Sequence, residues 1–475
     1  MSRRSAAATR RRDRRSAFAA VVVLALAACG SGDGPAADTT GTATEPTEPI
    51  AAPAGDGSAA PPADTAGEPV DGTTPADTSG VDDGGGDTGD GTTGGTDADP
   101  GFAALGPPTG EPLVIGMVNT EGTPGLDFPE MRTDTDLAVD YLNAHGGMGG
   151  RPITIEHCAS NGSPETSQAC AQELSGKGVE FVLLGLDLFP GYDTFEASGI
   201  PVFGALPILP GDYSADALFL TGGNATTMAA MVALARDHVG ASTVGIISAD
   251  NPGANGSEAA LTGALDKAGI AHRSVKGGDN ETDAGFQGLI REANEGDPDL
   301  LVSLYSDAGC IGAMRGRVSL GIATPVVSTA ICGSAEVIDV VGDDALGWYF
   351  VGVGTDLSTP AADVFGEIIE PAYGDLATAS LGVGALGITQ VMTLAIVAND
   401  IAEAGGAVTG EAIHERLATA TDLRNFPNGT PLACGLSATY PSVCSFHFPI
   451  GEYEAGGTIR TVPGFEAVSV VDFLP

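Results

Sequence analysis

Basic residues are scarce in this chain. Its 475 residues hold 20 Lys and Arg against 62 Asp and Glu, and seven of the 20 are arginines crowded into residues 3–15. Nucleic acid binding needs clusters of Lys and Arg that contact phosphates. The composition therefore argues against a nucleic-acid partner, and we interpret the acidity as a feature that favours solubility.

The motifs of common catalytic and metal sites are also missing. The six histidines form no HExxH pair, and the cysteines show no CxxC or Cys/His spacing of the kind that binds zinc. Neither a G-x-S-x-G motif nor a Walker A motif occurs. The G-x-G-x-x-G string at residues 382–387 has no strand before it, so we interpret its glycines as helix-packing residues. The sequence thus predicts no enzyme activity, no metal and no cofactor.

Residues 1–28 are predicted to be an export signal. The arginines are followed by an apolar run, residues 17–28, which is too short for the ~20 residues that span a bilayer. The run ends in Leu-Ala-Ala-Cys, which resembles a bacterial lipobox and implies lipidation of Cys29 after cleavage. The alternative is an ordinary signal peptide in which Cys29 has no role. The expected location is the outer face of the cell membrane, with the protein anchored through lipid.

Residues 29–110 have the composition of a disordered linker. Gly, Ala, Thr, Pro and Asp dominate, and residues 30–110 contain 15 acidic residues with no Lys or Arg. Such a segment cannot bury enough apolar surface to offset its ordering entropy. We expect a flexible acidic tether between the anchor and a folded part.

Short apolar runs alternate with helical patterns through the rest of the chain. Residues 113–118 and 153–155 read as strands, and between them Leu137, Ala138, Tyr141 and Leu142 share one helix face. A strand, an amphipathic helix and a second strand form a βαβ unit, which implies a parallel sheet covered on both faces. The pattern runs through two series of strands, so we predict an α/β fold with two Rossmann-like lobes.

The later part of the chain is predicted to return to both lobes. Residues 355–440 are mostly helical, and the last residues alternate as terminal strands do. We assign residues 111–222 and 355–440 to lobe 1, and residues 223–354 and 441–475 to lobe 2. A multi-strand hinge would then join the lobes near residues 220–223, 351–355 and 435–445.

Six cysteines follow Cys29, and an even number in an exported protein favours disulfides. Six cysteines allow fifteen connectivities. They fall into three pairs that are close in sequence, and these are the predicted bridges: Cys158–Cys170, Cys310–Cys332 and Cys434–Cys444.

Three segments resemble one known family. "LAVDYLNAHGGMGGRPITIEH" at residues 137–157 is similar to the first helix and second strand of type 1 periplasmic binding proteins, in the Leu/Ile/Val-binding family of ABC importers. Residues 244–256 and "EGDPDLLVSLY" at 295–305 are similar to that family's second lobe. The resemblance implies a lipid-anchored receptor that closes two lobes on a small solute and presents it to a membrane ABC permease.

In a doubly wound fold, ligands bind beyond the carboxyl ends of the strands. The loops at these ends supply the candidate ligand-binding residues. In lobe 1 they are Thr120, Glu121, Leu186, Asp187, Ala205, Leu206, Pro207 and Ile208. In lobe 2 they are Asp250, Asn251, Tyr305, Ser306 and residues 329–332, beginning with Thr329.

The lobe 1 loops depart from the family's pattern. Amino-acid-binding relatives place Ser or Thr hydroxyls there, whereas this chain has Leu186-Asp187 and Ala205-Leu206-Pro207-Ile208. We expect an amino acid-like solute or amide, a more apolar solute, or one with a cation that meets Asp187 or Glu121. Two other functions stay open: a ligand-sensing receptor of the same fold and a lipid-anchored cleft hydrolase.

Overall fold

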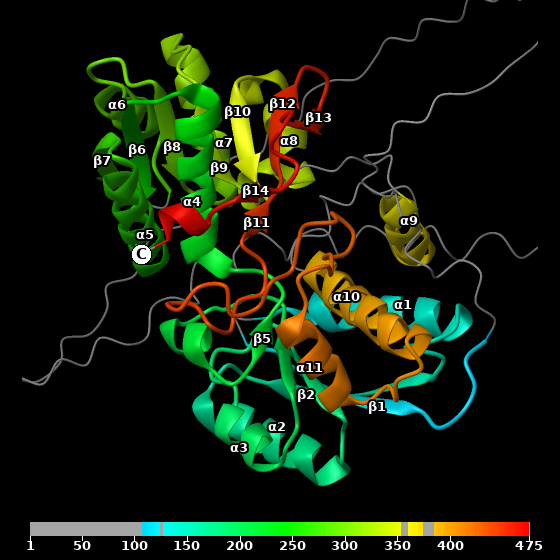
Figure 1. The fold of residues 1–475 in the computed structure, drawn as a ribbon. Helices are drawn as coiled ribbons and strands as arrows, with labels where there is room; N and C mark the ends of the chain where they lie inside the picture. Colours follow the sequence, from blue (N-terminus) through cyan, green and yellow to red (C-terminus); the bar gives the residue numbers. More distant parts are fainter. Residues whose placement is uncertain (1–106, 124–126, 279, 353–359, 374–383, 475) are drawn as a thin grey trace, which may run out of the picture. The chain divides into compact units, whose positions relative to one another are not determined.

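The computed structural model describes residues 107–123, 127–278, 280–352, 360–373 and 384–474. These residues form two α/β lobes, each built on its own mostly parallel sheet (Figure 1). The predicted signal peptide, Cys29 and nearly all of the predicted linker lie outside the described residues. The two-lobed α/β fold predicted from the alternation of strands and helices is confirmed.

Lobe 1 contains a five-stranded parallel sheet in the order β2-β1-β3-β4-β5. The strands are β1 (Leu113–Thr120), β2 (Ile153–Ser160), β3 (Phe181–Leu184), β4 (Val202–Gly204) and β5 (Leu218–Phe219). The first four were predicted from their apolar runs. The fifth has two residues, which is too short to show a period in the sequence.

The sheet of lobe 1 is covered on both faces. Leu113, Ile115 and Met117 of β1 face one core, and Val118 faces the other, as the two-residue period of a strand requires. The helices of the second face are α2 (Pro164–Lys177) and α3 (Tyr192–Ala197). The helices of the first face are α1 (Pro129–Ala144), α9 (Pro360–Tyr373), α10 (Gly384–Glu403) and α11 (Gly410–Thr419).

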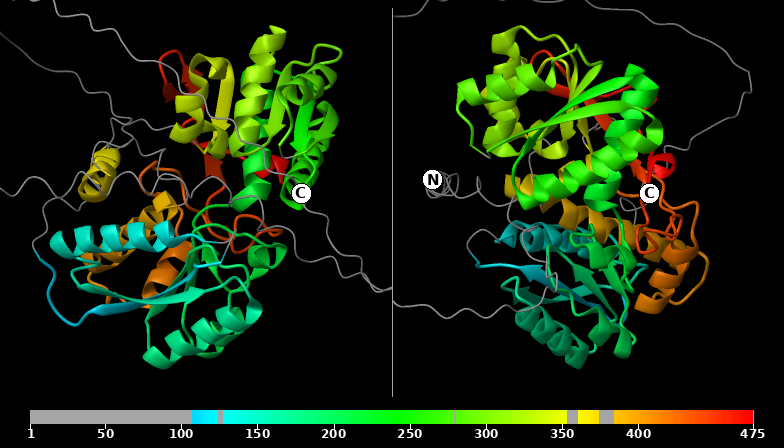
Figure 2. Two further views of the ribbon diagram at one scale, coloured as in Figure 1. Left: turned by 180° about the vertical axis from the view of Figure 1, so that it is seen from behind. Right: turned by 90° about the vertical axis from the view of Figure 1, so that its left-hand side faces the viewer.

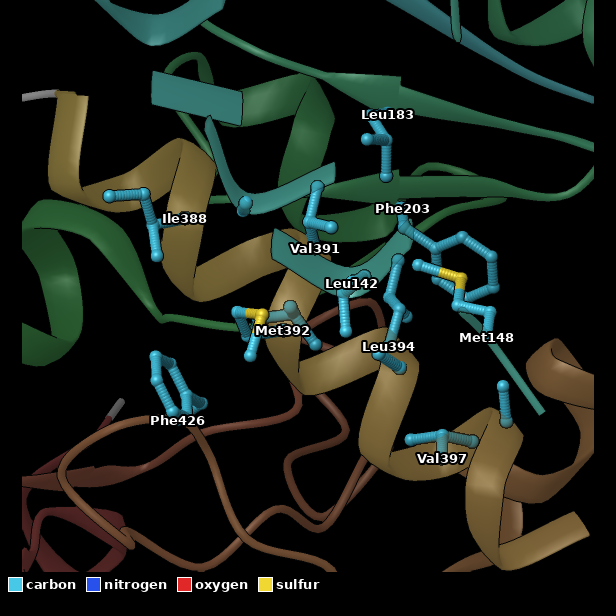
Figure 3. Packing of buried hydrophobic residues seen from close by; sticks show 14 of the residues in the cluster. Leu142, Met148, Leu183, Phe203, Ile388, Val391, Met392, Leu394, Val397 and Phe426 are labelled. Atoms are coloured by element: carbon cyan, nitrogen blue, oxygen red, sulfur yellow. The ribbon is translucent and has the colours of Figure 1, made fainter. Parts of the chain in front are cut away.

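Helix α10 is the centre of the larger lobe 1 core. It lies beside α1 in the views of Figures 1 and 2. Its buried side chains face Leu142, Leu183 and Phe203 (Figure 3). Among the described helices it is the one long and apolar enough to cross a membrane. Its burial in lobe 1 explains that composition, because a core helix needs apolar residues on most of its surface.

Two glycines allow α10 to approach α1 closely. A Cβ on Gly384 would meet the Asp134 carboxylate, and a Cβ on Gly387 would lie 2.5 Å from Thr135 Oγ1 and 2.6 Å from the Met131 carbonyl oxygen. These glycines belong to the G-x-G-x-x-G string, of which residues 382 and 383 lie outside the described residues. The described glycines pack helices, as predicted.

Replacing Gly387 by alanine should therefore destabilise the protein. The new methyl group overlaps α1, which costs about 1–3 kcal/mol of unfolding free energy, measured by urea denaturation. Gly256→Ala is the matched control, because Gly256 lies in a helix with open space around it. That control should be neutral or stabilising by up to about 1 kcal/mol. Equal effects of the two substitutions would contradict the packing role.

Lobe 2 contains a seven-stranded sheet in the order β13-β12-β10-β9-β8-β6-β7. The five strands from β10 to β7 in this order are parallel, and β12 and β13 are antiparallel additions. The strands are β6 (Thr243–Ala249), β7 (Ala271–Gly277), β8 (Leu300–Leu304), β9 (Val326–Thr329), β10 (Trp348–Val351), β12 (Ile450–Glu454) and β13 (Thr458–Thr461).

Helices cover both faces of this sheet as well. One face packs against α4 (Gly223–Leu234) and α5 (Pro252–Ala268), together with the C-terminal segment. The other packs against α6 (Asp283–Ala293), α7 (Asp307–Leu320) and α8 (Ala335–Val341). A separate two-stranded sheet joins β11 (His447–Phe448) to β14 (Val468–Ser469).

Phe219, directly before the first segment expected in the hinge, pairs with the expected segment 435–445. The Phe219 N–H donates to the Ser442 carbonyl at 2.8 Å, and the Cys444 N–H donates to the Phe219 carbonyl at 2.8 Å. The third expected segment, residues 351–355, lies mostly outside the described residues. The residue boundaries assigned to the lobes stay predictions.

All three predicted disulfides are present. They join Cys158 to Cys170, Cys310 to Cys332, and Cys434 to Cys444. Each closes a short loop of 12, 22 or 10 residues, so their partners could be found from sequence distance alone.

Candidate functional site

A series of hydrogen bonds between hydroxyl groups connects the carboxyl ends of β1, β2 and β3. The series ends at a buried carboxylate. The Thr120 hydroxyl lies 3.1 Å from that of Ser160, which donates to Asp187 Oδ1 at 3.0 Å. Ser167, on α2, donates to the same oxygen at 2.6 Å. The structure thus connects two predicted site residues, Thr120 and Asp187, through a serine that the sequence analysis did not identify.

Asp187 is turned into lobe 1. Asp187 is 2% exposed, and its Oδ2 atom is closed off from solvent. The backbone N–H groups of Leu188 and Phe189 also help to stabilise its charged form, whereas Oδ2 has no hydrogen-bond partner among the described residues. Burial raises the pKa of Asp187, and these N–H groups and the two serines act against that rise. A buried charge is tolerated when it is hydrogen-bonded, so Asp187 fixes the loop that follows β3.

Asp212 has the same role for the loop that follows β4. Its Oδ2 accepts hydrogen bonds from the N–H groups of Ile208 at 2.8 Å and Leu209 at 2.7 Å. Its Oδ1 accepts one from the Tyr192 hydroxyl at 2.8 Å. Burial raises the pKa of Tyr192, which keeps that hydroxyl protonated as a donor. Asp212 has no local signal in the sequence, because its partner Tyr192 is 20 residues away.

Glu121 is engaged in an ion pair within lobe 1. Arg132 Nε lies 2.9 Å from Glu121 Oε1 and 3.2 Å from Oε2. Asn119 Nδ2 also donates to Oε1, and Asn119 Oδ1 accepts the Leu186 N–H at 3.1 Å. The Glu121 charge is thus compensated by the protein itself.

A further carboxyl group at this edge, Glu130 in the first turn of α1, is partly buried. Burial, reinforced by the charges of Asp134, Asp127 and Glu121, raises its pKa to about 6. A carboxyl group with a shifted pKa, at the sheet edge where a ligand is expected, is a candidate functional residue. The amino-acid composition alone does not identify it.

Gln390 connects α10 to the same edge. Its Nε2 donates to the carbonyl oxygens of Phe203 at 2.6 Å and Leu184 at 3.3 Å, at the ends of β4 and β3. The residue is fully buried. Gln390 therefore holds together the two strands whose loops carry Leu186, Asp187 and residues 205–208.

Asp250 and Asn251, the two predicted residues at the carboxyl end of β6, have different environments. Asn251 is the N-cap of α5, where its Oδ1 accepts the Ala254 N–H at 2.8 Å. Asp250 is exposed, and its Oδ1 lies 3.4 Å from Asn255 Nδ2. The structure gives Asn251 a capping role and leaves Asp250 accessible.

The predicted residues that follow β8 and β9 are also unequal in exposure. Tyr305 is 4% exposed, and its ring packs against Phe286 in the lobe 2 core. Ser306 and Thr329 are partly exposed. The Ser306 hydroxyl makes no capping hydrogen bond to α7, although the residue stands at the N-cap. The ligand contact predicted for Tyr305 stays a prediction, and an aromatic contact to a solute requires the ring to leave the core.

The serine–aspartate contact in lobe 1 can be tested on one helix. Ser167→Ala removes a donor from a buried carboxylate, so the unfolding free energy should fall by about 1–3 kcal/mol in urea denaturation. Ser175→Ala, also on α2, is the control, because the Ser175 hydroxyl has no hydrogen-bond partner among the described residues. Its effect should stay within about 0.5 kcal/mol. A Ser167 effect no larger than the control would show that Asp187 does not depend on this donor.

The two sets of strand ends differ in chemistry. Lobe 1 presents apolar loops fixed from beneath by buried aspartates, and lobe 2 presents accessible polar groups at Asp250, Ser306 and Thr329. Within the described ranges, no group of three or more His, Cys, Asp and Glu could hold a metal. Such edges can bind a small molecule through apolar contact and a few hydrogen bonds.

Known structures have the same fold. An ABC transporter substrate-binding protein from Sphaerobacter thermophilus is 19% identical with a TM-score of 0.59, covering 74% of this chain and 96% of its own. LivJ from Streptococcus pneumoniae, solved with isoleucine, is 16% identical with a TM-score of 0.54, covering 74% and 99%. A fatty acid ABC transporter substrate-binding protein from Thermomonospora curvata is 13% identical with a TM-score of 0.55, covering 78% and 97%. No curated protein sequence matches the chain significantly.

Two mostly parallel sheets in two lobes, with candidate residues at the strand ends, define a protein of the type 1 periplasmic binding fold. The family model described as periplasmic binding protein matches residues 112–433. The chain therefore belongs to the periplasmic binding protein family, whose general role is the binding of small solutes. The family resemblance found in the sequence is confirmed.

Proposed function

We propose that this protein is the solute-binding component of an ABC importer. It binds a small solute between its two lobes at the carboxyl ends of both sheets, and it delivers the solute unchanged to a membrane permease. The observation that carries the proposal is the family match over residues 112–433, together with strand-end loops that are chemically suited to a ligand. Solute contacts to both lobes favour a closed state, because only that state makes both sets of contacts.

The N-terminal segment supports an anchored location. The arginine cluster, the apolar run and Cys29 follow the order of a lipoprotein signal, and an acidic tether separates Cys29 from the folded part. The protein then acts at the outer face of the cell membrane. Relatives that bind isoleucine and that belong to a fatty acid transporter share its fold, so the solute class must be taken from this chain's own residues.

A solute screen tests the proposal. Amino acids, amides, fatty acids and short alcohols are added to the purified protein, and thermal unfolding is followed together with native mass spectrometry. At a hundredfold excess over its Kd, a true solute should stabilise the folded state by about 2.7 kcal/mol. The solute should be recovered unaltered. Stabilisation by none of them would contradict the proposal, and release of a cleavage product would favour the hydrolase alternative.

A lobe 2 variant tests where the solute lies. Ser306→Ala removes a hydroxyl that does not cap its helix, so solute affinity should fall about two- to tenfold with unfolding unchanged. Ser319→Ala on the same helix is the control, because Ser319 is exposed near the far end of α7. Affinity is measured by isothermal titration calorimetry. An unchanged affinity in Ser306→Ala would remove this strand end from the site.

A further inference from the structure

We propose that the part of the solute that contacts lobe 1 is apolar, and that the described strand-end loops of lobe 1 offer no anchor for the head group of an α-amino acid. This inference rests on the proposed function and narrows its solute class. The contact surface is called the apolar rim here. It consists of Leu186, Leu188, Phe189, Leu206, Ile208 and Leu209.

The apolar rim comprises two loops of nearly uniform composition. The loop after β3 reads Leu-Asp-Leu-Phe-Pro at residues 186–190, and the loop after β4 reads Ala-Leu-Pro-Ile-Leu-Pro at residues 205–210. Asp187 is the one polar side chain in both. It faces the interior, so the side chains left at the strand ends are hydrocarbon.

The rim residues are not used by the lobe 1 core. All six are partly exposed, and none belongs to either hydrophobic cluster that covers the lobe 1 sheet. A contiguous apolar surface that remains outside a core marks an interaction site or a ligand-binding groove. Their position at the carboxyl ends of β3 and β4 is where a ligand of this fold is expected.

Several backbone donors of these loops are already engaged. The Ile208 and Leu209 N–H groups bind Asp212, and the Leu186 N–H binds Asn119. Those of Leu188 and Phe189 help to stabilise the charged form of Asp187. Proline at residues 190, 207 and 210 supplies no N–H. A solute carboxylate would therefore find few hydrogen-bond donors here. Removing its hydration water without new hydrogen bonds costs free energy.

Three charged groups of this edge, Asp187, Arg132 and Glu121, are engaged as well. Asp187 accepts hydrogen bonds from Ser160 and Ser167 and is closed to solvent, so it cannot receive an ammonium group in this structure. Arg132 and Glu121 are paired with each other. Of the options left open by the sequence, the structure thus favours the more apolar solute over one whose cation meets Asp187 or Glu121.

The solute class that fits is an aliphatic or aromatic molecule with no more than one polar head group. Its hydrocarbon part lies on the apolar rim, and a polar group is left for the accessible residues of lobe 2, Asp250, Ser306 and Thr329. An amphiphile of this kind needs no zwitterion site in lobe 1.

A matched set of solutes tests the inference by calorimetry. Norleucine, hexanoate and 1-hexanol differ in their head groups on comparable unbranched chains, and 1-octanol and octanoate extend the chain by two methylenes. We expect hexanol or hexanoate to bind at least tenfold more tightly than norleucine. Each added methylene should tighten binding about fourfold, so octanol should exceed hexanol by roughly 16-fold.

The outcomes separate the inference from the proposed function. Norleucine binding more tightly than both hexanol and hexanoate would overturn the apolar class and leave solute binding intact. Affinity that does not rise with chain length would also overturn it. Absence of binding across this set and the wider solute screen would overturn the proposed function and the inference together.

Rim variants locate the contact. Ile208→Ser and Leu188→Ser should each weaken octanol binding by about tenfold, with the melting temperature of the solute-free protein checked for each. Val318→Ser is the control: Val318 is 47% exposed on α7, so it also reports non-specific adsorption of amphiphiles to lobe 2. The control should leave affinity unchanged. Loss of binding in Val318→Ser, or full binding in both folded rim variants, would overturn the rim as the contact surface.

Discussion

The form of the lobe 1 edge depends on two buried carboxylates. Asp187 and Asp212 are almost fully enclosed, and an enclosed charge destabilises the folded state unless donors surround it. Asp187 accepts hydrogen bonds from two serine hydroxyls, and Asp212 accepts them from the Tyr192 hydroxyl and from two backbone N–H groups of its own loop. The donors are turned inward to satisfy the charges, and the remaining apolar side chains are left at the strand ends. Because the buried carboxylates must be stabilised from inside, the outer face of the loops presents mainly apolar side chains to a ligand.

Much of the architecture follows from local sequence patterns. Apolar runs located β1, β3 and β8, and the distance between cysteines identified the three disulfides. The glycines of the G-x-G-x-x-G string were predicted to pack helices because no strand precedes them, and Gly384 and Gly387 do lie against α1. These features depend on residues close in the chain, which is why a single sequence is sufficient to find them.

The site could be predicted only as a set of loops. Asp187 was placed at the correct strand end, yet its partners Ser160 and Ser167 lie 27 and 20 residues earlier, so its inward orientation has no local signal. Asp212 was missed for the same reason. Tyr305 follows a strand in the expected place, but its ring fills the lobe 2 core against Phe286. Position along a strand gives the edge on which a residue lies, whereas side-chain direction depends on distant packing partners.

Hydrogen–deuterium exchange with and without solute tests the central claim most directly, because it reports on both lobes in one experiment. The account predicts that a bound solute slows exchange in the strand-end loops of lobe 1, residues 186–190 and 205–210, and in those of lobe 2 around residues 250 and 306. The outer helices α2 and α6 should show no comparable change. Protection confined to one lobe, or located on those outer helices, would contradict a solute held by the strand ends of both sheets.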